Sequence, residues 1–226
     1  MLLHVPAVLD ATELSRCRDL LAAADWADGR ITAGTQSARE KRNLQLPESA
    51  PQLSELRTIV ESALARHGLF FSAALPARIY PPLFNRYEGG MDFGDHIDNA
   101  MRQLPQGGWL RTDLSATLFL CEPDDYDGGE LRIDDRFAEH WVKLPAGDLV
   151  LYPATTVHRV EPVTRGVRLA SFFWIQSLVR DVGERALLFD MDLALSRLRG
   201  ELGERQELVE LTGVYHNLLR RWGGPH

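Results

Sequence analysis

The sequence predicts a mainly β protein with helices on both sides of the β core. Between residues 78 and 178, short apolar runs follow one another, separated by Gly, Pro and Asp clusters, and none is long enough for a stable helix. The segments on either side carry apolar residues at helical spacing. A chain of 226 residues has room for one substantial domain rather than two. We therefore expect an antiparallel sandwich or barrel, packed against an N-terminal helical flank (1–77) and followed by a C-terminal helical extension (179–226).

Two helices are predicted in the N-terminal flank. The first spans residues 10–24, where Asp10 can cap the helix and apolar residues recur at helical spacing. The second spans residues 51–67 and is expected to end at Gly68. A short strand at 31–33 is the expectation for the polar stretch between them.

The β region predicts a series of strands separated by turns. The strands are expected at 77–87, 114–121, 130–133, 140–144, 148–152, 157–161 and 167–178. Turns are expected at 127–129, 145–148 and 164–166, where Gly, Pro and Asp gather. The last turn would form a hairpin that brings Arg168 close to His158.

The C-terminal extension predicts two amphipathic helices. Apolar residues have helical spacing over 187–198, and Gly200 and Gly203 are expected to end that run. A second helix is predicted over 208–219.

Composition excludes several classes of protein. Hydrophobic residues make up 45% and charged residues 25%, as in an ordinary soluble protein. The net charge of −7 argues against a nucleic-acid partner, because phosphate contacts need clustered cations. The chain has no apolar run of about 18 residues that could span a membrane, and no signal peptide is expected from its first residues. Cys17 and Cys121 form no Cys-x-x-Cys pair, so neither a disulfide framework nor a cysteine zinc site is indicated, and the cytoplasm is the expected compartment.

The clearest candidate for chemistry is a set of two histidines and one aspartate. On an extended segment, His96 and Asp98 would point to the same side, as adjacent ligands of a metal do. His158 opens a later extended run. Two imidazoles and one carboxylate form the facial triad that binds non-haem Fe(II) and leaves three coordination positions open.

Arg168 is the second candidate, because it is a cation in the middle of an apolar strand. An unpaired buried cation is costly, and a fixed carboxylate partner would relieve that cost. The guanidinium fork suits the distal carboxylate of 2-oxoglutarate. Both faces of the strand are largely apolar, so alternation alone does not decide where Arg168 points.

The order His96-x-Asp98, then His158, then Arg168 ten residues later resembles Fe(II)/2-oxoglutarate dioxygenases. More narrowly, the chain is similar to the bacterial PKHD-type hydroxylases of the prolyl-4-hydroxylase-like branch. The resemblance is strong over residues 78–178, and the helical flanks also fit. Neighbouring segments that agree are 84–90 (Phe84-Asn85-Arg86-Tyr87-Glu88-Gly89-Gly90), 115–120 (Ser115-Ala116-Thr117-Leu118-Phe119-Leu120), 127–131 (Asp127-Gly128-Gly129-Glu130-Leu131) and 144–148 (Leu144-Pro145-Ala146-Gly147-Asp148).

This resemblance implies a double-stranded β-helix (jelly-roll or cupin-like) core. It implies that His96, Asp98 and His158 are the catalytic iron ligands and that Arg168 binds 2-oxoglutarate. Tyr87 matches a tyrosine that hydrogen-bonds the cosubstrate in relatives, although a buried strand aromatic explains it equally well. The implied reaction is hydroxylation with release of succinate and CO2. It requires Fe(II), 2-oxoglutarate and O2, with ascorbate as a candidate reductant.

Two other functions fit part of the pattern. A cupin-like hydrolase or isomerase with Zn(II) or Mn(II) could use the same three ligands, but it would give Arg168 no specific task. A non-catalytic module that senses 2-oxoglutarate or metal would bind without turnover. The sequence predicts a small-molecule or peptide substrate without identifying it. The C-terminal helices are expected either to cover the barrel or to join the subunits of a homo-oligomer.

Overall fold

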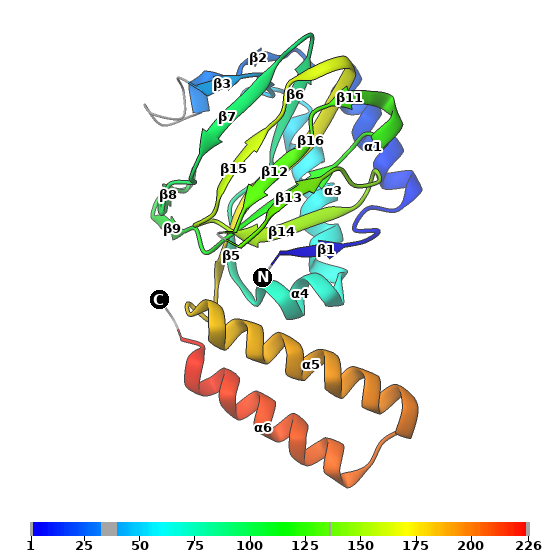
Figure 1. Ribbon diagram of the computed structural model, residues 1–226, viewed down its shortest axis with the longest axis vertical. Helices are drawn as coiled ribbons and strands as arrows, with labels where there is room; N and C mark the ends of the chain where they lie inside the picture. The colour runs from blue at the N-terminus through cyan, green and yellow to red at the C-terminus, as the bar shows by residue number, and fades with distance from the viewer. Residues whose placement is uncertain (1, 33–39, 136, 225–226) are drawn as a thin grey trace.

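The computed structural model of the protein describes residues 2–32, 40–135 and 137–224. Two antiparallel sheets form its centre, helices pack on the larger sheet, and a pair of long helices projects at the C-terminal end (Figure 1). The prediction of a mainly β protein with flanking helices is therefore confirmed.

The larger sheet has nine strands among the described residues. Its order is β1-β14-β10-β16-β6-β4-β2, and β5 and β11 also pair with β16. The bounds are β1 Leu3–Val5, β2 Ala27–Asp28, β4 Leu44–Gln45, β5 Pro76–Ile79, β6 Leu83–Glu88, β10 Leu114–Phe119, β11 Tyr126–Gly128, β14 Leu149–Pro153 and β16 Val163–Ser177.

The smaller sheet has five described strands in the order β13-β12-β15-β7-β3. Its bounds are β3 Lys41–Arg42, β7 Asp92–His96, β12 Leu131–Asp134, β13 Glu139–Val142 and β15 Val157–Val160. A separate hairpin consists of β8 Met101–Gln103 and β9 Trp109–Arg111, and a 3-10 turn, η2, covers Pro123–Asp125.

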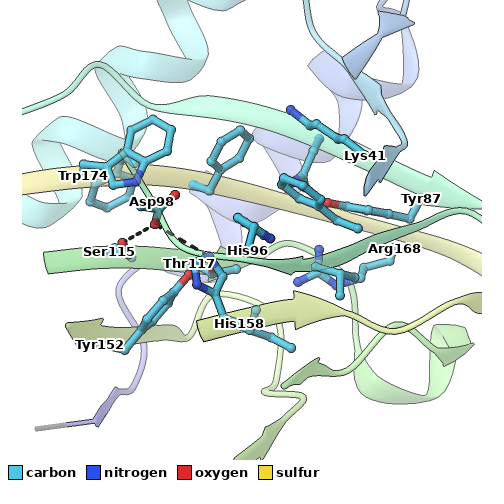
Figure 2. Close-up of a pocket in the computed structure, with 17 residues that line it drawn as sticks. Lys41, Tyr87, His96, Asp98, Ser115, Thr117, Tyr152, His158, Arg168 and Trp174 are labelled. Atoms are coloured by element: carbon cyan, nitrogen blue, oxygen red, sulfur yellow. Dashed lines mark hydrogen bonds and ion pairs between the residues drawn. The ribbon is translucent and has the colours of Figure 1, made fainter. Parts of the chain in front are cut away.

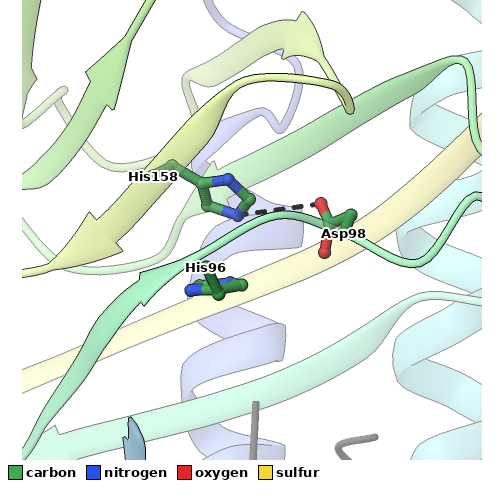
Figure 3. A group of neighbouring side chains, drawn as sticks. All are labelled: His96, Asp98 and His158. Atoms are coloured by element: carbon green, nitrogen blue, oxygen red, sulfur yellow. Dashed lines mark ion pairs between the residues drawn. The ribbon is translucent and has the colours of Figure 1, made fainter. Parts of the chain in front are cut away.

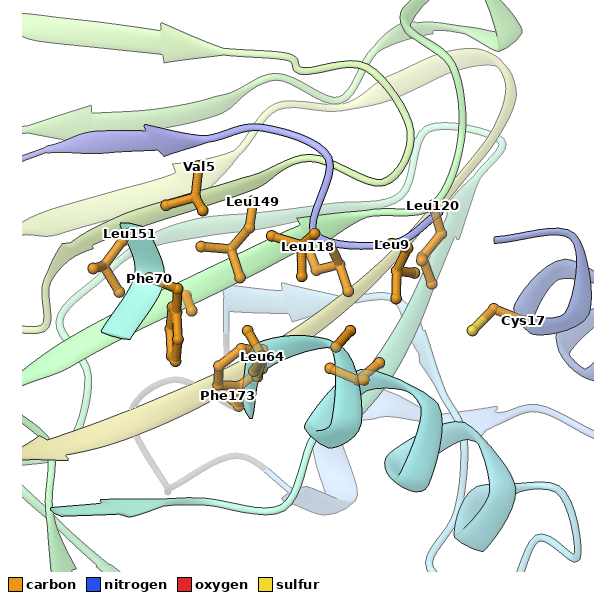
Figure 4. Packing of buried hydrophobic residues seen from close by; sticks show 14 of the residues in the cluster. Val5, Leu9, Cys17, Leu64, Phe70, Leu118, Leu120, Leu149, Leu151 and Phe173 are labelled. Atoms are coloured by element: carbon orange, nitrogen blue, oxygen red, sulfur yellow. The ribbon is translucent and has the colours of Figure 1, made fainter. Parts of the chain in front are cut away.

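The main hydrophobic core lies between the larger sheet and the helices of the N-terminal flank (Figure 4). Leu118 and Leu149 of the sheet pack with Leu64 and Phe70 of the helices, and all four are buried. Because side chains alternate along a strand, the other face of β10 and β14 is directed at the smaller sheet. A second apolar cluster and the functional site fill the space between the two sheets.

The N-terminal flank confirms both predicted helices, with one addition. Helix α1 (Ala11–Ala22) begins at a capping box in which Asp10 and Glu13 exchange hydrogen bonds, and α3 covers Leu53–Arg66. A further helix, α4 (Gly68–Ala74), starts at the glycine that was expected only to stop a helix. The side chain of His67 accepts a bond from the amide of Phe70, which lets a new helix begin there.

The expected strand at 31–33 is wrong over its described part. A 3-10 turn, η1 (Gly29–Thr32), covers that part, and residue 33 lies outside the described residues. The carboxylate of Asp28 accepts a hydrogen bond of 3.0 Å from the backbone amide of Arg30, which favours a tight turn. The flank also contributes β1 to β4 to the two sheets, so it is not purely helical.

Two strand predictions need correction. The run 77–87 is divided into β5 and β6 by Pro81 and Pro82, which lack the amide that a ladder requires. The predicted hairpin with a turn at 164–166 is wrong: β15 pairs with β12 and β7 in the smaller sheet, whereas β16 belongs to the larger one. The chain changes sheets at Glu161 and Pro162, and residues 164–166 already lie within β16.

Gly166 is nevertheless required at its place in β16. Its φ is +72°, and a Cβ atom there would come 2.1 Å from the carbonyl oxygen of Asp125. The glycine thus reflects the close approach of β11 rather than a hairpin turn.

The two C-terminal helices are confirmed, with longer bounds. They are α5 (Val182–Leu202) and α6 (Gln206–Trp222). Gly200 lies inside α5 and does not end it, contrary to the prediction, whereas Gly203 follows its last turn with a φ of +68°. Among the residues that the structure describes, no helix is long and apolar enough to cross a membrane.

Candidate metal and cosubstrate site

The three predicted ligand residues come together between the two sheets (Figure 3). One nitrogen or oxygen atom from each of His96, Asp98 and His158 lies within 4.8 Å of the other two. Nε2 of His158 is 3.7 Å from Oδ2 of Asp98. Two imidazoles and a carboxylate at this spacing match the donor set preferred by Fe(II) in non-haem sites.

The strand register explains why two of these residues meet. His96 is the last residue of β7 and lies opposite His158 of β15 across the antiparallel pair. Nδ1–H of His96 donates to the carbonyl of Gly94 at 2.8 Å, and Nδ1–H of His158 donates to that of Thr156 at 3.1 Å. With the proton of each ring on Nδ1, the Nε2 atoms keep a lone pair for a metal.

Asp98 follows β7 and is held from the opposite sheet. Ser115 of β10 donates from Oγ to Oδ2 of Asp98 at 2.6 Å. Burial, followed by the repulsion of His158, lowers the pKa of His96 to about 4. The ring is therefore neutral near pH 7, as a metal ligand must be.

Arg168 lies in the same cavity and is almost completely buried, with 1% of its surface exposed. Within the described part of the chain, none of its three guanidinium nitrogens has a hydrogen-bond partner, and no carboxylate forms an ion pair with it. Its guanidinium carbon lies 5.3 Å from the ring centre of Tyr87 and 5.4 Å from that of Phe119. A buried cation with unused donors fits an anionic ligand that enters the cavity.

Tyr87 is the neighbour of Arg168 in the register of β6 and β16. Burial raises the pKa of its phenol to about 12, although Arg168 acts in the opposite direction. The hydroxyl therefore keeps its proton and can donate it in a hydrogen bond. Asn85, on the same face of β6, also lines the cavity and donates from Nδ2 to the Tyr87 hydroxyl at 3.5 Å.

Strand β16 extends from one end of the cavity to the other (Figure 2). Arg168, Phe172 and Trp174 occupy alternate positions and line it, so they share one face of the strand. At about 3.3 Å per residue, Arg168 and Trp174 are about 20 Å apart along the strand. Ser115 pairs with Trp174 in the register. The ligand triad thus lies between two ends of the cavity, one formed by Arg168 and the other by Trp174.

The structure brings all five predicted site residues into one cavity, but not by the predicted hairpin. Arg168 and His158 face each other from different sheets. Sequence reasoning gave no role to Ser115, although a polar residue at alternate positions of an apolar strand was a usable signal. It also missed Lys41, which lines the cavity from β3 and lies in a stretch without a strand pattern.

Comparison with known protein families identifies two matching regions. Residues 82–176 match the 2OG-Fe(II) oxygenase superfamily, and residues 183–224 match the PKHD-type hydroxylase C-terminal domain. A PKHD-type hydroxylase from Burkholderia lata is 59% identical over 224 residues, which cover 98% of this chain and 99% of that protein.

Solved structures share the fold at lower identity. A prolyl hydroxylase from Trichoplax adhaerens, in complex with a peptide fragment of the hypoxia inducible factor oxygen degradation domain, is 16% identical with a TM-score of 0.53. The match covers 82% of this chain and 86% of that chain. A non-haem α-ketoglutarate-dependent carbocyclase from nogalamycin biosynthesis is 18% identical with a TM-score of 0.55, covering 79% and 80% of the two chains. The two facing sheets are thus the double-stranded β-helix core of this fold.

Proposed function

The chain belongs to the PKHD-type hydroxylases, and on that premise we propose that His96, Asp98 and His158 hold its Fe(II) while Arg168 binds 2-oxoglutarate. The protein is an Fe(II)- and 2-oxoglutarate-dependent dioxygenase. One observation supports this assignment of residues. Arg168 is buried without a hydrogen-bond partner among the described residues, and it lies in the same cavity as the cluster of two histidines and one carboxylate.

The ligand residues are suited to this task before any metal binds. The carbonyls of Gly94 and Thr156 fix the two imidazoles with Nε2 available, and Ser115 fixes the carboxylate. When bound, Fe(II) supplies the dioxygen chemistry that couples decarboxylation of 2-oxoglutarate to hydroxylation of a C–H bond.

Arg168 would bind the distal carboxylate of 2-oxoglutarate through two parallel N–H bonds. Tyr87, whose hydroxyl stays protonated, would donate a further hydrogen bond to the same cosubstrate. Apolar residues such as Leu131 and Val160 line the cavity and limit the access of water to the reaction. The protein itself contributes by holding the reactants close together and in the correct orientation.

The reaction balances as follows: substrate R–H, 2-oxoglutarate and O2 give R–OH, succinate and CO2. One oxygen atom enters the product and the other enters succinate. The test is to load the protein anaerobically with Fe(II) and 2-oxoglutarate, add oxygen with a panel of extracts, and measure succinate together with a product that is 16 Da heavier than its substrate.

Three outcomes separate the candidate functions. Succinate formed one-for-one with 2-oxoglutarate consumed supports the hydroxylase. Product formation without consumption of 2-oxoglutarate would favour a metal-dependent hydrolase or isomerase. Binding of 2-oxoglutarate with no succinate from any extract would favour a sensing module.

We also propose several finer features of the function. Ascorbate acts as the reductant that returns the iron to Fe(II). The cytoplasm is the compartment, and its support is that Cys17 and Cys121 are both free and buried. The substrate is a small molecule or a peptide.

Exposed apolar residues of the C-terminal helices, such as Leu187 and Val209, support association between copies of the chain.

A further inference from the structure

The hairpin of α5 and α6 is the part of the molecule that the proposed chemistry does not use. It projects at the C-terminal end (Figure 1), and none of its residues lines the cavity. Five of its large apolar side chains are 37–61% exposed, and we call them the hairpin face: Leu187, Leu198 and Leu202 of α5, and Leu211 and Val214 of α6. Apolar surface of this kind, gathered in one place, is typical of an interaction site.

The α5 part of the hairpin face points away from the body of the protein. Leu193 of α5 packs against the main hydrophobic core. Because an α-helix turns by about 100° per residue, Leu187 lies about 120° around the helix from Leu193. Leu198 and Leu202 lie about 140° and about 180° from it. The described part of the chain therefore leaves these three side chains to the solvent.

A hydrogen bond between the two helices distinguishes the two sides of the hairpin. Nη2 of Arg199 donates to Oγ1 of Thr212 at 3.1 Å, so these residues lie on the same side. Leu195 of α5 belongs to the apolar cluster that both helices share. Around α5, Arg199 lies about 40° from Leu195 in one direction, and Leu198 lies about 60° from it in the other. Leu198 is therefore on the side opposite Arg199.

Helix α6 presents its exposed apolar residues on that same opposite side. Tyr215 of α6 belongs to the shared cluster. Around α6, Thr212 lies about 60° from Tyr215 in one direction. Leu211 and Val214 lie about 40° and about 100° from Tyr215 in the other direction. Since Thr212 marks the Arg199 side, the exposed residues of the two helices form one continuous face.

The hairpin face is large enough for a stable interface. At about 1.5 Å per residue, α5 is about 31 Å long and α6 is about 25 Å long. Two helices of about 10 Å diameter, lying side by side, present roughly 500 Å² in projection before the relief of the side chains is counted. A standard interface buries about 800 Å² of accessible surface on each partner. One partner could thus bury an area of that order.

The charges around the hairpin face favour a second copy of the chain over a membrane. From Asp181 to Trp222 there are eight acidic and six basic residues, whereas a helix that lies on an anionic lipid surface needs an excess of cations. Glu210 and Arg221 are exposed and lie about 40° and about 20° beyond Val214 around α6. The acidic residue is near the first end of α6 and the basic residue is at its last turn.

Such an edge is complementary to itself when it is reversed. If α6 of a second copy ran antiparallel, Glu210 of each copy would lie beside Arg221 of the other. The same holds for α5, where the exposed Asp190 precedes the exposed Arg197 by seven residues on the outer edge. Opposite charges would thus meet along both helices, which gives the pair one preferred direction.

We propose that two copies of the chain associate through the hairpin face, with α5 against α5 and α6 against α6 in antiparallel directions, as a four-helix bundle. This inference rests on the proposed association between copies and deepens it by naming the face and its orientation. The bundle would enclose the exposed apolar residues of both hairpins, while each copy keeps its own complete cavity.

The test is sedimentation equilibrium of the full-length protein over a range of micromolar concentrations. We expect the unaltered protein to have twice the 25.4 kDa mass of one chain. Leu198→Lys and Val214→Lys should each weaken association about a hundredfold or more, because the two-fold symmetry buries the new charge twice. A monomer at every concentration would overturn the inference, and binding of that monomer to phosphatidylglycerol vesicles would assign the face to a lipid surface instead.

Phe71→Lys is the matched control. Phe71 of α4 is also a large apolar residue, 54% exposed, but it lies outside the hairpin. This variant should associate as tightly as the unaltered protein. If Leu198→Lys and Val214→Lys did so as well, the hairpin face would not be the interface.

A charge reversal tests the antiparallel orientation. Arg221→Glu would place two acidic groups side by side at both ends of the α6 pair, and it should weaken association about tenfold. Adding Glu210→Arg to Arg221→Glu restores opposite charges, so the double variant should recover most of the loss. An unchanged affinity in Arg221→Glu, or a double variant as weak as the single one, would overturn the orientation.

Affinity for 2-oxoglutarate, measured on the same samples after Mn(II) loading, separates this inference from the proposed function. Leu198→Lys and Val214→Lys should bind 2-oxoglutarate as the unaltered protein does, since the hairpin lies outside the cavity. If the unaltered protein does not bind 2-oxoglutarate, the proposed function fails while the dimer stands. A dimer that survives both substitutions overturns this inference alone. Should one variant lose 2-oxoglutarate binding through misfolding, the other decides.

Discussion

The hydrogen bond from Ser115 to Asp98 connects the two sheets at the metal site. Oγ of Ser115 lies 2.6 Å from Oδ2 of Asp98. His96 and His158 belong to strands of the smaller sheet, whereas Ser115 belongs to β10 of the larger one. The orientation of the only carboxylate in the triad therefore depends on how the sheets face each other.

Removing this bond should weaken metal binding. In Ser115→Ala, the carboxylate of Asp98 would lose its fixed orientation, and partners of this kind typically contribute about 10- to 100-fold to metal affinity. We expect a loss of about tenfold for Fe(II) or Mn(II), measured by competition with a chelator. Thr58→Ala is the control, since Thr58 is exposed and its hydroxyl donates to the carbonyl of Ser54 within the same helix. Equal affinities of the two variants would contradict the role of Ser115.

Replacing Arg168 should stabilise the protein in the absence of 2-oxoglutarate. It should also remove the stabilisation that 2-oxoglutarate binding provides. Arg168→Met keeps a long side chain but deletes an uncompensated buried charge, so the free energy of unfolding should rise by about 1 kcal/mol. The unaltered protein should gain about 2.7 kcal/mol from 2-oxoglutarate at one hundred times its Kd, and the variant should gain almost nothing. Chemical denaturation with and without the cosubstrate measures both, and Mn(II) affinity should persist.

Arg185→Met provides a matched control for that experiment. Arg185 is also buried, at 2% exposure, but it donates to the carbonyl of Val179 at 2.9 Å, outside the cavity. Its replacement should destabilise the protein and leave the gain from 2-oxoglutarate unchanged. A gain that survives in Arg168→Met would remove Arg168 from its assigned role.

Gly129 should affect cosubstrate binding because of the space it leaves for Arg168. A Cβ atom at Gly129 would lie 2.9 Å from Tyr126, 2.9 Å from Val163 and 3.1 Å from Cδ of Arg168. We expect Gly129→Ala to displace Arg168 and weaken 2-oxoglutarate binding about tenfold, a loss of about 1.4 kcal/mol. Calorimetric titration of the Mn(II)-loaded protein measures this.

Gly203→Ala separates backbone strain from this contact. Both glycines have a φ of +68°, so alanine is strained at either position, but nothing lies within 4 Å of a Cβ atom at Gly203. If the two variants bound 2-oxoglutarate equally well, the displacement of Arg168 would be refuted.

The sequence predicted the members of the site better than the way in which they meet. The triad and Arg168 could be identified because residue type and order carry that information. The hairpin expectation failed because local turn residues do not indicate that a chain changes sheets, as it does at Pro162. Pairing between distant strands is decided by packing over the whole core.

Lys41 shows the limit of sequence reasoning most clearly. It lies on a two-residue strand in a polar stretch, where no periodicity can develop. Its burial follows from its register opposite Phe93 of β7, a contact between residues far apart in the chain. By contrast, α5 and α6 were predictable because long amphipathic helices carry their pattern within one segment.

Acidification should destabilise the metal-free protein through His96. Burial, and after it the proximity of His158, lowers the pKa of native His96 to about 4, against about 6.5 in the unfolded chain. Between these values the unfolded chain binds a proton that the native protein does not, so stability rises with pH and is lost as pH falls from about 6.5 towards 4.

The size of this effect can be isolated with one variant. His96 should contribute up to about 1.4 kcal/mol per pH unit in that window, measured by denaturant unfolding of the chelator-treated protein at several pH values. His96→Gln removes the titrating ring while Asp98, Lys41 and His158, the charged and titratable groups that act on it, remain. Its unfolding free energy should therefore depend less steeply on pH. If the unfolding free energies of the two proteins changed with pH in parallel, the surroundings of His96 would not be keeping its ring neutral. Burial would then not explain why its Nε2 is available to a metal.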